Sequence, residues 1–249
     1  MKSGFTLSEL LVAMAIAGVI AALTVPGFVS RYQNDSQIMN LKKIYTELGT
    51  NLEVLKSENI YGNLYKSRLA DKVEYTNFIK ENYKIVSEAC GGDKQKCFAP
   101  SSEKKDEDGN TVKDEEDNII YETIYKNLNN EQIDVALSGG YGFLTKGGYS
   151  MYIVPADASK QTPVLVHVDV NASELPNIIG RDFFSFKIYE DYSIDVITPT
   201  ERRTAGAKNL RAGLAANASS DDNGAACKAS VNGFACFGRL LNNNFKVDY

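Results

Sequence analysis

One apolar run near the N-terminus constrains the fold of this chain more than any other feature. Residues 5–25 are almost entirely apolar, with a single carboxylate, Glu9, inside the run. As an α-helix, about 21 residues rise about 31 Å, which matches the hydrocarbon core of a bilayer. The run is apolar on every face, which excludes a surface helix of a globular domain. A carboxylate inside such a helix costs about 2.5–3.5 kcal/mol at its centre and less near its end, so we expect Glu9 to have a function.

A cleaved secretory signal is the alternative explanation of this run. The apolar core of such a signal is about 7–15 residues long and is followed by a small-x-small cleavage site. Here the run is longer, and Thr6, Ser8 and Glu9 place polar side chains where the apolar core should begin. The residues after the run, Thr24-Val25-Pro26-Gly27, are a poor cleavage site. The sequence therefore favours a helix that is retained.

The hexapeptide GFTLSE at residues 4–9, followed by the apolar run, resembles the N-terminus of type IV pilins and type II secretion pseudopilins. In that family a prepilin peptidase on the cytoplasmic side cuts after the glycine and N-methylates the new terminal residue. The resemblance makes residues 1–4 a leader peptide, places the cut between Gly4 and Phe5, and makes Phe5 the methylated residue. It also implies that Pro26 occupies the place of a helix-kinking proline.

Charge explains how such a segment would be oriented and assembled. Lys2 and the initiating amine favour a cytoplasmic N-terminus. Removal of the leader creates an ammonium at Phe5, four residues from Glu9. We expect Glu9 of one subunit to pair with the Phe5 ammonium of a neighbour, because pairing offsets the desolvation of each charge. The simpler alternative is that Glu9 extends to the lipid headgroups.

Beyond Pro26 the pattern becomes amphipathic. Apolar residues recur at three- and four-residue spacings, which predicts that the helix continues to about residue 58 and packs on a soluble domain. They are Ile38, Leu41, Ile44, Tyr45, Leu48, Leu52 and Leu55. The expected organisation is a membrane and polymerisation helix over 5–29 and a globular head over 30–249, with its first helix over 30–58. The predicted fold class is α+β and pilin-like, a long N-terminal helix packed on an antiparallel sheet.

Strand patterns predict the sheet over about 119–198. Short runs of β-branched and aromatic residues lie between Gly, Pro and Asp. They cover residues 119–125, 133–137, 149–154, 163–170, 183–189 and 193–197. The charged residues 100–118 predict a surface loop, with an alternative role as a contact surface between subunits or with a partner. Residues 237–249 are expected to form a last strand or a tucked tail.

Four cysteines form two local pairs in the sequence. Cys90 and Cys97 are one pair, and Cys227 and Cys236 are the other. Three pairings exist in principle, and the short separations in an exported domain favour two local disulfides, Cys90–Cys97 and Cys227–Cys236. The spacings do not suit zinc, so a metal–thiolate cluster or free thiols are the lesser alternatives.

Residues 169–184 resemble a segment of many pilin-like proteins of the form Asp-x-Asn-Gly…Pro-Asn-x-x-Gly-x-Asp-x-Phe, with Ala172 in place of the usual glycine. The resemblance implies an ordered connection between two strands, in which Ala172 alters the turn. Oxygens of Asp169, Asn171 and Asp182 suit Ca²⁺ by their chemistry, but the spacing is not that of an EF-hand. We expect hydrogen bonding in Asx-turns as their main role.

Nothing in the sequence indicates an enzyme or a nucleic-acid-binding protein. No nucleophile, phosphate-loop, dinucleotide or zinc motif is present, and the one histidine, His167, lies among valines in a predicted strand. The formal charge of −5 belongs to the head, and the sequence has no basic stripe with aromatics between, which argues against a head built for nucleic acid. No cofactor is expected apart from the calcium alternative.

These features predict a subunit of a type IV pilus-like filament, with a type II secretion pseudopilin as the alternative. The family implies other pilins, the prepilin peptidase, an assembly ATPase and a platform membrane protein as partners. It implies residence in the inner membrane as a single-pass protein, with the N-terminus cytoplasmic, and later in a surface or periplasmic filament. An exported binding protein that keeps Met1 and uses the helix only as an anchor is the hypothesis of another class.

Overall fold

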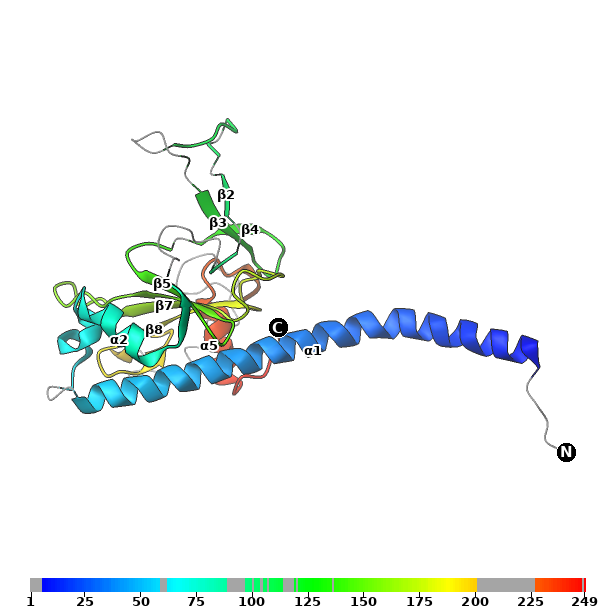
Figure 1. Ribbon diagram of the computed structural model, residues 1–249, viewed down its shortest axis with the longest axis horizontal. Coiled ribbons are helices and arrows are strands. Elements are labelled where there is room, and N and C mark those ends of the chain that lie inside the picture. Colours follow the sequence, from blue (N-terminus) through cyan, green and yellow to red (C-terminus); the bar gives the residue numbers. More distant parts are fainter. Residues whose placement is uncertain are drawn as a thin grey trace.

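The N-terminal helix α1 (Leu7–Glu58) extends far beyond the rest of the molecule (Figure 1). At about 1.5 Å per residue it is about 78 Å long. The computed structural model describes residues 6–58, 62–88, 97–99, 101–103, 105–106, 108–113, 119, 121–135, 137–200, 227–247 and 249. Pro26 lies inside α1, and the helix continues through it as one gently curved rod. The Pro26 ring removes one backbone donor without ending the helix.

The C-terminal half of α1 is fastened to the head by one apolar face. Ile38, Leu41 and Ile44 are at most 3% exposed, and so are Leu48, Leu52 and Leu55. Their three- and four-residue spacing places them on one side of the helix. Tyr45 lies at the edge of this face, stacked at an angle against Phe237 and Phe245. The amphipathic pattern in the sequence therefore predicted the packing face correctly.

A six-stranded antiparallel sheet covers this face (Figure 1). Its order is β1-β5-β6-β7-β8-β9, with each strand hydrogen-bonded to the next in the list. The strands are β1 (Ile85–Ser87), β5 (Tyr141–Thr145), β6 (Ser150–Val154), β7 (Val164–Asp169), β8 (Phe183–Ile188) and β9 (Ile194–Asp195). A long helix on an antiparallel sheet confirms the predicted α+β, pilin-like fold class.

The centre of the sheet is buried on both faces. On β7, Val164, Val166 and Val168 belong to the core cluster that contains the α1 residues. His167 and Asp169 point to the opposite face and are only 5% and 0% exposed. On that face a second cluster includes Tyr125, Tyr152 and Phe183. Sequence alternation had indicated one apolar face, whereas the fold also covers the polar one.

A smaller sheet helps to cover the face of the main sheet that carries His167 and Asp169. It has the order β2-β3-β4, with β2 (Ser101–Glu103), β3 (Tyr121–Lys126) and β4 (Gln132–Asp134), all antiparallel. Strands β2 and β3 project from the side of the head opposite α1 (Figure 1). The expected loop over 100–118 is therefore partly a hairpin, because β2 pairs with β3 and Lys105 bridges to Thr111. Residues 100, 104, 107 and 114–118 lie outside the described residues.

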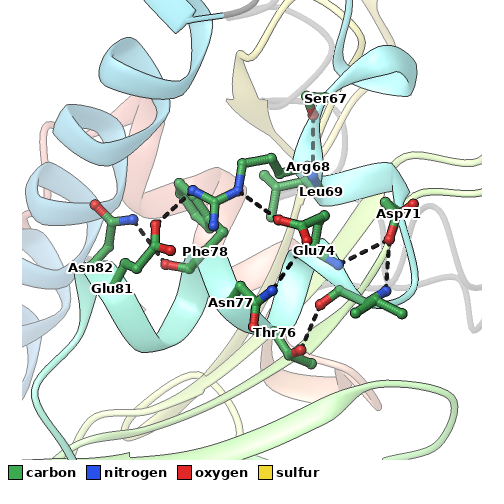
Figure 2. A network of polar contacts seen from close by, with 11 residues as sticks. Ser67, Arg68, Leu69, Asp71, Glu74, Thr76, Asn77, Phe78, Glu81 and Asn82 are labelled. Carbon is green, nitrogen blue, oxygen red and sulfur yellow. Dashed lines mark hydrogen bonds and ion pairs between the residues drawn. The ribbon is translucent and has the colours of Figure 1, made fainter.

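Short helices follow α1 before the first strand. They are η1 (Leu64–Lys66), η2 (Arg68–Ala70) and α2 (Glu74–Asn82). Asp71 caps the start of α2, because its Oδ1 accepts the N–H groups of Val73 and Glu74 at 2.8 and 2.9 Å (Figure 2). Arg68 reaches Glu81 at 2.7 Å and Glu74 at 3.4 Å, and so joins η2 to both ends of α2.

The C-terminal region is helical, which corrects the expectation of a last strand. Helix η5 (Cys227–Ala229) leads to α5 (Phe234–Asn242), and residues 201–226 lie outside the described residues. The aromatic ring of Phe237 stacks on Phe186 of β8 with centroids 4.6 Å apart. The apolar spacing of residues 234–241 fits a short amphipathic helix, but it was too brief to distinguish from a strand. Beyond α5 the chain end is tucked, as the other alternative expected, since the Tyr249 hydroxyl donates to the Gly180 carbonyl at 2.7 Å.

The remaining strands show where pattern alone was insufficient. The six predicted runs overlap β3, β4, β6, β7, β8 and β9. Strands β1, β2 and β5 were not predicted: β1 and β2 have three residues each, and β5 contains Gly142. Such strands are defined by their neighbours in the sheet, because they carry too little alternation of their own.

Gly180 lies in close contact with the Cys227–Cys236 disulfide and with the C-terminal Tyr249. Its φ is +87°, a value that L side chains rarely adopt, and an added β-carbon would meet the sulfur atoms of Cys236 and Cys227. Its carbonyl is also the acceptor for Tyr249. Both its backbone conformation and its contacts therefore require glycine.

We expect Gly180→Ala to lower the free energy of unfolding by about 3 kcal/mol or more, because left-handed strain adds to overpacking against the disulfide. Gly139→Ala is the matched control. Gly139 has φ +73° but open space around its Cα, so that variant should lose only about 1–2 kcal/mol. Denaturant unfolding of the full chain in detergent measures both, and equal losses would show that the disulfide contact is unimportant.

Candidate functional site

The described chain begins at Thr6, and helix α1 starts with a reciprocal cap. The Glu9 Oε2 accepts the Thr6 N–H at 2.8 Å and the Thr6 hydroxyl at 2.9 Å. In return the Thr6 Oγ1 accepts the Glu9 N–H at 3.3 Å. This is the capping box formed by Thr and Glu three residues apart. Gly4 and Phe5, the expected cleavage and methylation residues, lie outside the described residues.

Thr6 is the capping partner of Glu9, and our sequence reasoning missed it. The signal was available, because Thr-x-x-Glu before an apolar run is a helix-start pattern. The cap uses one oxygen of Glu9, since both bonds from Thr6 go to Oε2. Among the described residues nothing donates to Oε1. Glu9 is therefore positioned by its own helix through Oε2.

The N-terminal half of α1 has no cover in a single molecule. Every described side chain from residue 6 to 29 is exposed, including Leu11 at 60%, Met14 at 63% and Phe28 at 76%. Its most apolar window has a mean hydropathy of 2.3, and the helix is long and apolar enough to cross a membrane. An apolar surface this extended requires lipid or other protein. Pro26 lies near the end of this exposed half.

Of the three residues considered for calcium, Asp169 ends β7, and Asn171 and Asp182 lie in the connection between β7 and β8. The Asp169 Oδ2 accepts the Tyr125 hydroxyl at 2.6 Å, and its Oδ1 accepts the Asn171 N–H at 3.2 Å. The two oxygens of Asp182 accept the N–H groups of Asn177 and Ile178 at 2.7 and 2.6 Å. Asn171 donates to the carbonyls of Glu174 and Leu175. Of these contacts, the bond from the Asn171 N–H to Asp169 is the Asx-turn bond that the sequence suggested. The other bonds join the three side chains to more distant backbone groups and to Tyr125.

The same hydrogen bonds affect how many oxygens are available to a cation. Burial raises the pKa of Asp182 to about 6, and burial together with the nearby Asp182 raises the pKa of Asp169 well above its usual value. The oxygens of Asp169 and Asp182 already accept hydrogen bonds, whereas the buried Asn171 Oδ1 has no hydrogen-bond partner among the described residues. No group of three or more Asp, Glu, His or Cys gathers among the described residues. Calcium at these positions stays a prediction.

Ala172 has a left-handed backbone conformation, which glycine adopts more easily than alanine. Its φ is +59°, and its side chain is buried. The hydrogen bonds of the preceding residue, Asn171, hold the backbone in place. That Ala172 alters the turn relative to a glycine stays a prediction.

His167 has the structural role expected for it. Its Nδ1 lies 2.7 Å from the Ser185 Oγ, and its ring stacks on Phe183 with centroids 5.8 Å apart. Burial lowers the pKa of His167 to about 4. The imidazole is therefore neutral in the folded head at physiological pH.

One of the two expected disulfides lies within the described residues. Cys227 and Cys236 are joined, with their Cα atoms 4.4 Å apart, and the bridge fastens η5 to α5. Cys97 is also disulfide-bonded and fully buried. Cys90, its expected partner, lies outside the described residues.

Comparison with known proteins gives one match. Residues 1–25 match the family described as the prokaryotic N-terminal methylation motif. The N-terminus is a prepilin methylation motif. No curated protein matches the chain, and no solved structure does.

The prepilin motif explains the capped, exposed start of α1. It is the signature of type IV pilins and pseudopilins, whose members are processed by a prepilin peptidase and assemble into filaments. It points to a structural protein, and the apolar first half of α1 fits a membrane anchor. The motif ends at the apolar run, so it says nothing of the head.

We expect His167→Gln to change how stability depends on pH. The unfolded histidine has a pKa near 6.5 and the folded one about 4, so the unfolded chain binds more protons between these values. The wild-type head should lose about 3 kcal/mol of stability through this group as pH falls from 7 to 4. Because the chain has one histidine, the variant has none. Unfolding curves of both proteins that shift in parallel with pH would contradict this role.

Proposed function

We propose that this chain is a structural subunit of a type IV pilus-like filament. The observation that carries the proposal is the continuity of α1, whose exposed apolar half follows a prepilin motif and whose other half is covered by the head. Lipid would cover the apolar half before assembly, and the same half of neighbouring subunits would cover it in the filament. The Ala and Gly residues of this segment allow close approach of helices.

In this proposal Glu9 sets the position of each subunit. Thr6 holds the carboxylate through Oε2, and Oε1 receives the methylated Phe5 ammonium of a neighbour after the leader is removed. Two charges that are costly in an apolar environment then satisfy each other. The partners of this process would be other pilins, the prepilin peptidase, an assembly ATPase and a platform protein. The subunit would wait in the inner membrane with its N-terminus cytoplasmic.

Two alternatives differ in how experiment separates them from a pilus subunit. A type II secretion pseudopilin would share the N-terminal processing and differ in the machinery it joins. An anchored binding protein that never polymerises would keep Met1. The prepilin motif favours the processed forms.

Mass spectrometry of the mature N-terminus is the first test. We expect the chain to begin with N-methylated Phe5, because the peptidase removes residues 1–4. A Gly4→Leu variant is the control and should keep Met1, since the peptidase needs room at the residue before the cut. An intact Met1 in the wild-type protein would reject the filament proposal.

Glu9→Gln separates the cap from the charge. The glutamine oxygen can accept the same bonds from Thr6, so α1 should start normally and cleavage should proceed. Loss of the charge leaves the Phe5 ammonium unpaired, and we expect filament yield to fall by about tenfold or more. Thr6→Val is the matched control, because it removes a hydroxyl of the cap and keeps the charge. Normal filament yield from Glu9→Gln would show that Glu9 acts only as a cap.

A further inference from the structure

A lysine-lined groove lies between α1 and the edge of the main sheet. It has a volume of about 700 Å³ and contains Lys42 and Lys43 of α1, Lys84 after α2, and Lys146 in the β5–β6 turn. We call it the lysine groove. The chain carries a formal charge of −5, so a gathering of cations at one place runs against its overall charge.

The lysine groove is built from fixed elements. The Lys146 N–H donates to the Lys84 carbonyl at 2.8 Å, which clips the β5–β6 turn to the residue after α2. The Lys42 and Lys43 backbones are in the buried half of α1, next to Leu41 and Ile44, which are 0% and 1% exposed. The backbones of the four lysines are therefore held around one groove. A bound anion would offset the repulsion among their charges.

The positive charge of the lysine groove is not neutralised by ion pairs with the described residues. None of the four lysines forms an ion pair with any residue that the structure describes. Glu47 is the one carboxylate in the lining, and its Oε2 accepts the Tyr149 hydroxyl at 3.0 Å. The hydroxyls of Thr46 and Thr50 donate to carbonyls of α1, so they offer no free donor. Recognition here would depend on charge, with little from directed hydrogen bonds.

The chain itself contains a segment of complementary charge. Residues 103–117 hold eight acidic residues and three lysines. The net charge of this segment equals that of the whole chain, and all other charges balance. One of the eight, Glu103, already pairs with Lys105 at 3.0 Å. The remaining carboxylates exceed the remaining lysines.

A molecule cannot fill the groove with its own acidic segment. That segment is attached at β2 and β3, which project from the side of the head opposite α1 (Figure 1). The groove is on the α1 side, where Met39 and Thr50 are part of its lining. A second copy is free of this restriction.

We propose that the lysine groove of one subunit binds the acidic segment, residues 103–117, of a second copy. The inference rests on the proposed filament, in which copies meet at high local concentration. Exposed ion pairs are individually weak, so the contact gains its strength from several carboxylates that meet the four lysines together, and repetition along the assembly adds to it. It would select a lateral neighbour, whereas Glu9 and Phe5 set the axial step.

Binding of a peptide to the full chain tests the contact without a filament. The probe is a fluorescent peptide of residues 103–117, and the protein is the full chain in non-ionic detergent. We expect saturable binding at low salt that weakens steeply as the Debye length shortens. The same peptide with every Asp and Glu changed to Asn and Gln should not bind. Absence of binding by the acidic peptide at low salt would reject the proposal.

Charge reversal locates the binding site. Lys43→Glu with Lys146→Glu should weaken binding of the acidic peptide by about tenfold or more. The matched control is Lys56→Glu with Lys72→Glu, two exposed lysines outside the groove, which changes total charge equally and should leave most of the binding. Equal losses in both pairs would reject the groove as the site. Tighter binding of a heparin fragment or a single-stranded oligonucleotide of the same charge would assign the groove to another polyanion and reject the second copy.

Cells test whether the contact operates between subunits. The Lys43→Glu, Lys146→Glu chain should give fewer filaments, and adding Asp114→Lys and Glu115→Lys to it should restore them. Filaments unaffected by the first pair would reject the contact. If wild-type filaments are missing altogether, the proposed function fails, and the peptide experiment still decides whether the groove binds the segment.

Discussion

Helix α1 presents apolar surface along most of its length, and the head covers only its second half. The head buries one face of this half almost completely, whereas residues 6–29 are exposed. The buried residues are Ile38, Leu41, Ile44, Leu48, Leu52 and Leu55. Burial of each large apolar side chain contributes about 1.5–3 kcal/mol, so the covered face anchors the helix to the head. The uncovered half also has apolar surface to bury, and no described part of the molecule covers it. Membrane residence and assembly are two ways to meet that one requirement.

The head in turn depends on polar groups buried behind its sheet. Asp169 and Asp182 accept bonds from Tyr125 and from the backbone of residues 177 and 178. A buried carboxylate without such donors would cost several kcal/mol. These bonds join β7, β3 and the segment before β8 into one unit. Gly180, the disulfide and Tyr249 then lock the C-terminal helix onto it.

Much of the fold could be predicted because its signals are local. The three- and four-residue spacing in α1 and the β-branched runs of β6, β7 and β8 carry their own period. Strands β1 and β5 and helix α5 could not be assigned, since short segments take their structure from what they pack against. The cap at Thr6 was readable as a motif and was overlooked. The burial of His167 and Asp169 depended on a second sheet that sequence alternation does not reveal.

The sequence by itself determined the prepilin motif, the membrane-length helix and the amphipathic face that continues it, because each is written in consecutive residues. Only the tertiary structure decided that Asp169 and Asp182 are hydrogen-bonded in a buried layer. It also brought Lys42, Lys43, Lys84 and Lys146 together, and it placed the strands that carry the acidic segment on the other side of the head. The physical reason is that charges and hydrogen bonds act across space, between residues whose separation in the chain gives no sign of their proximity.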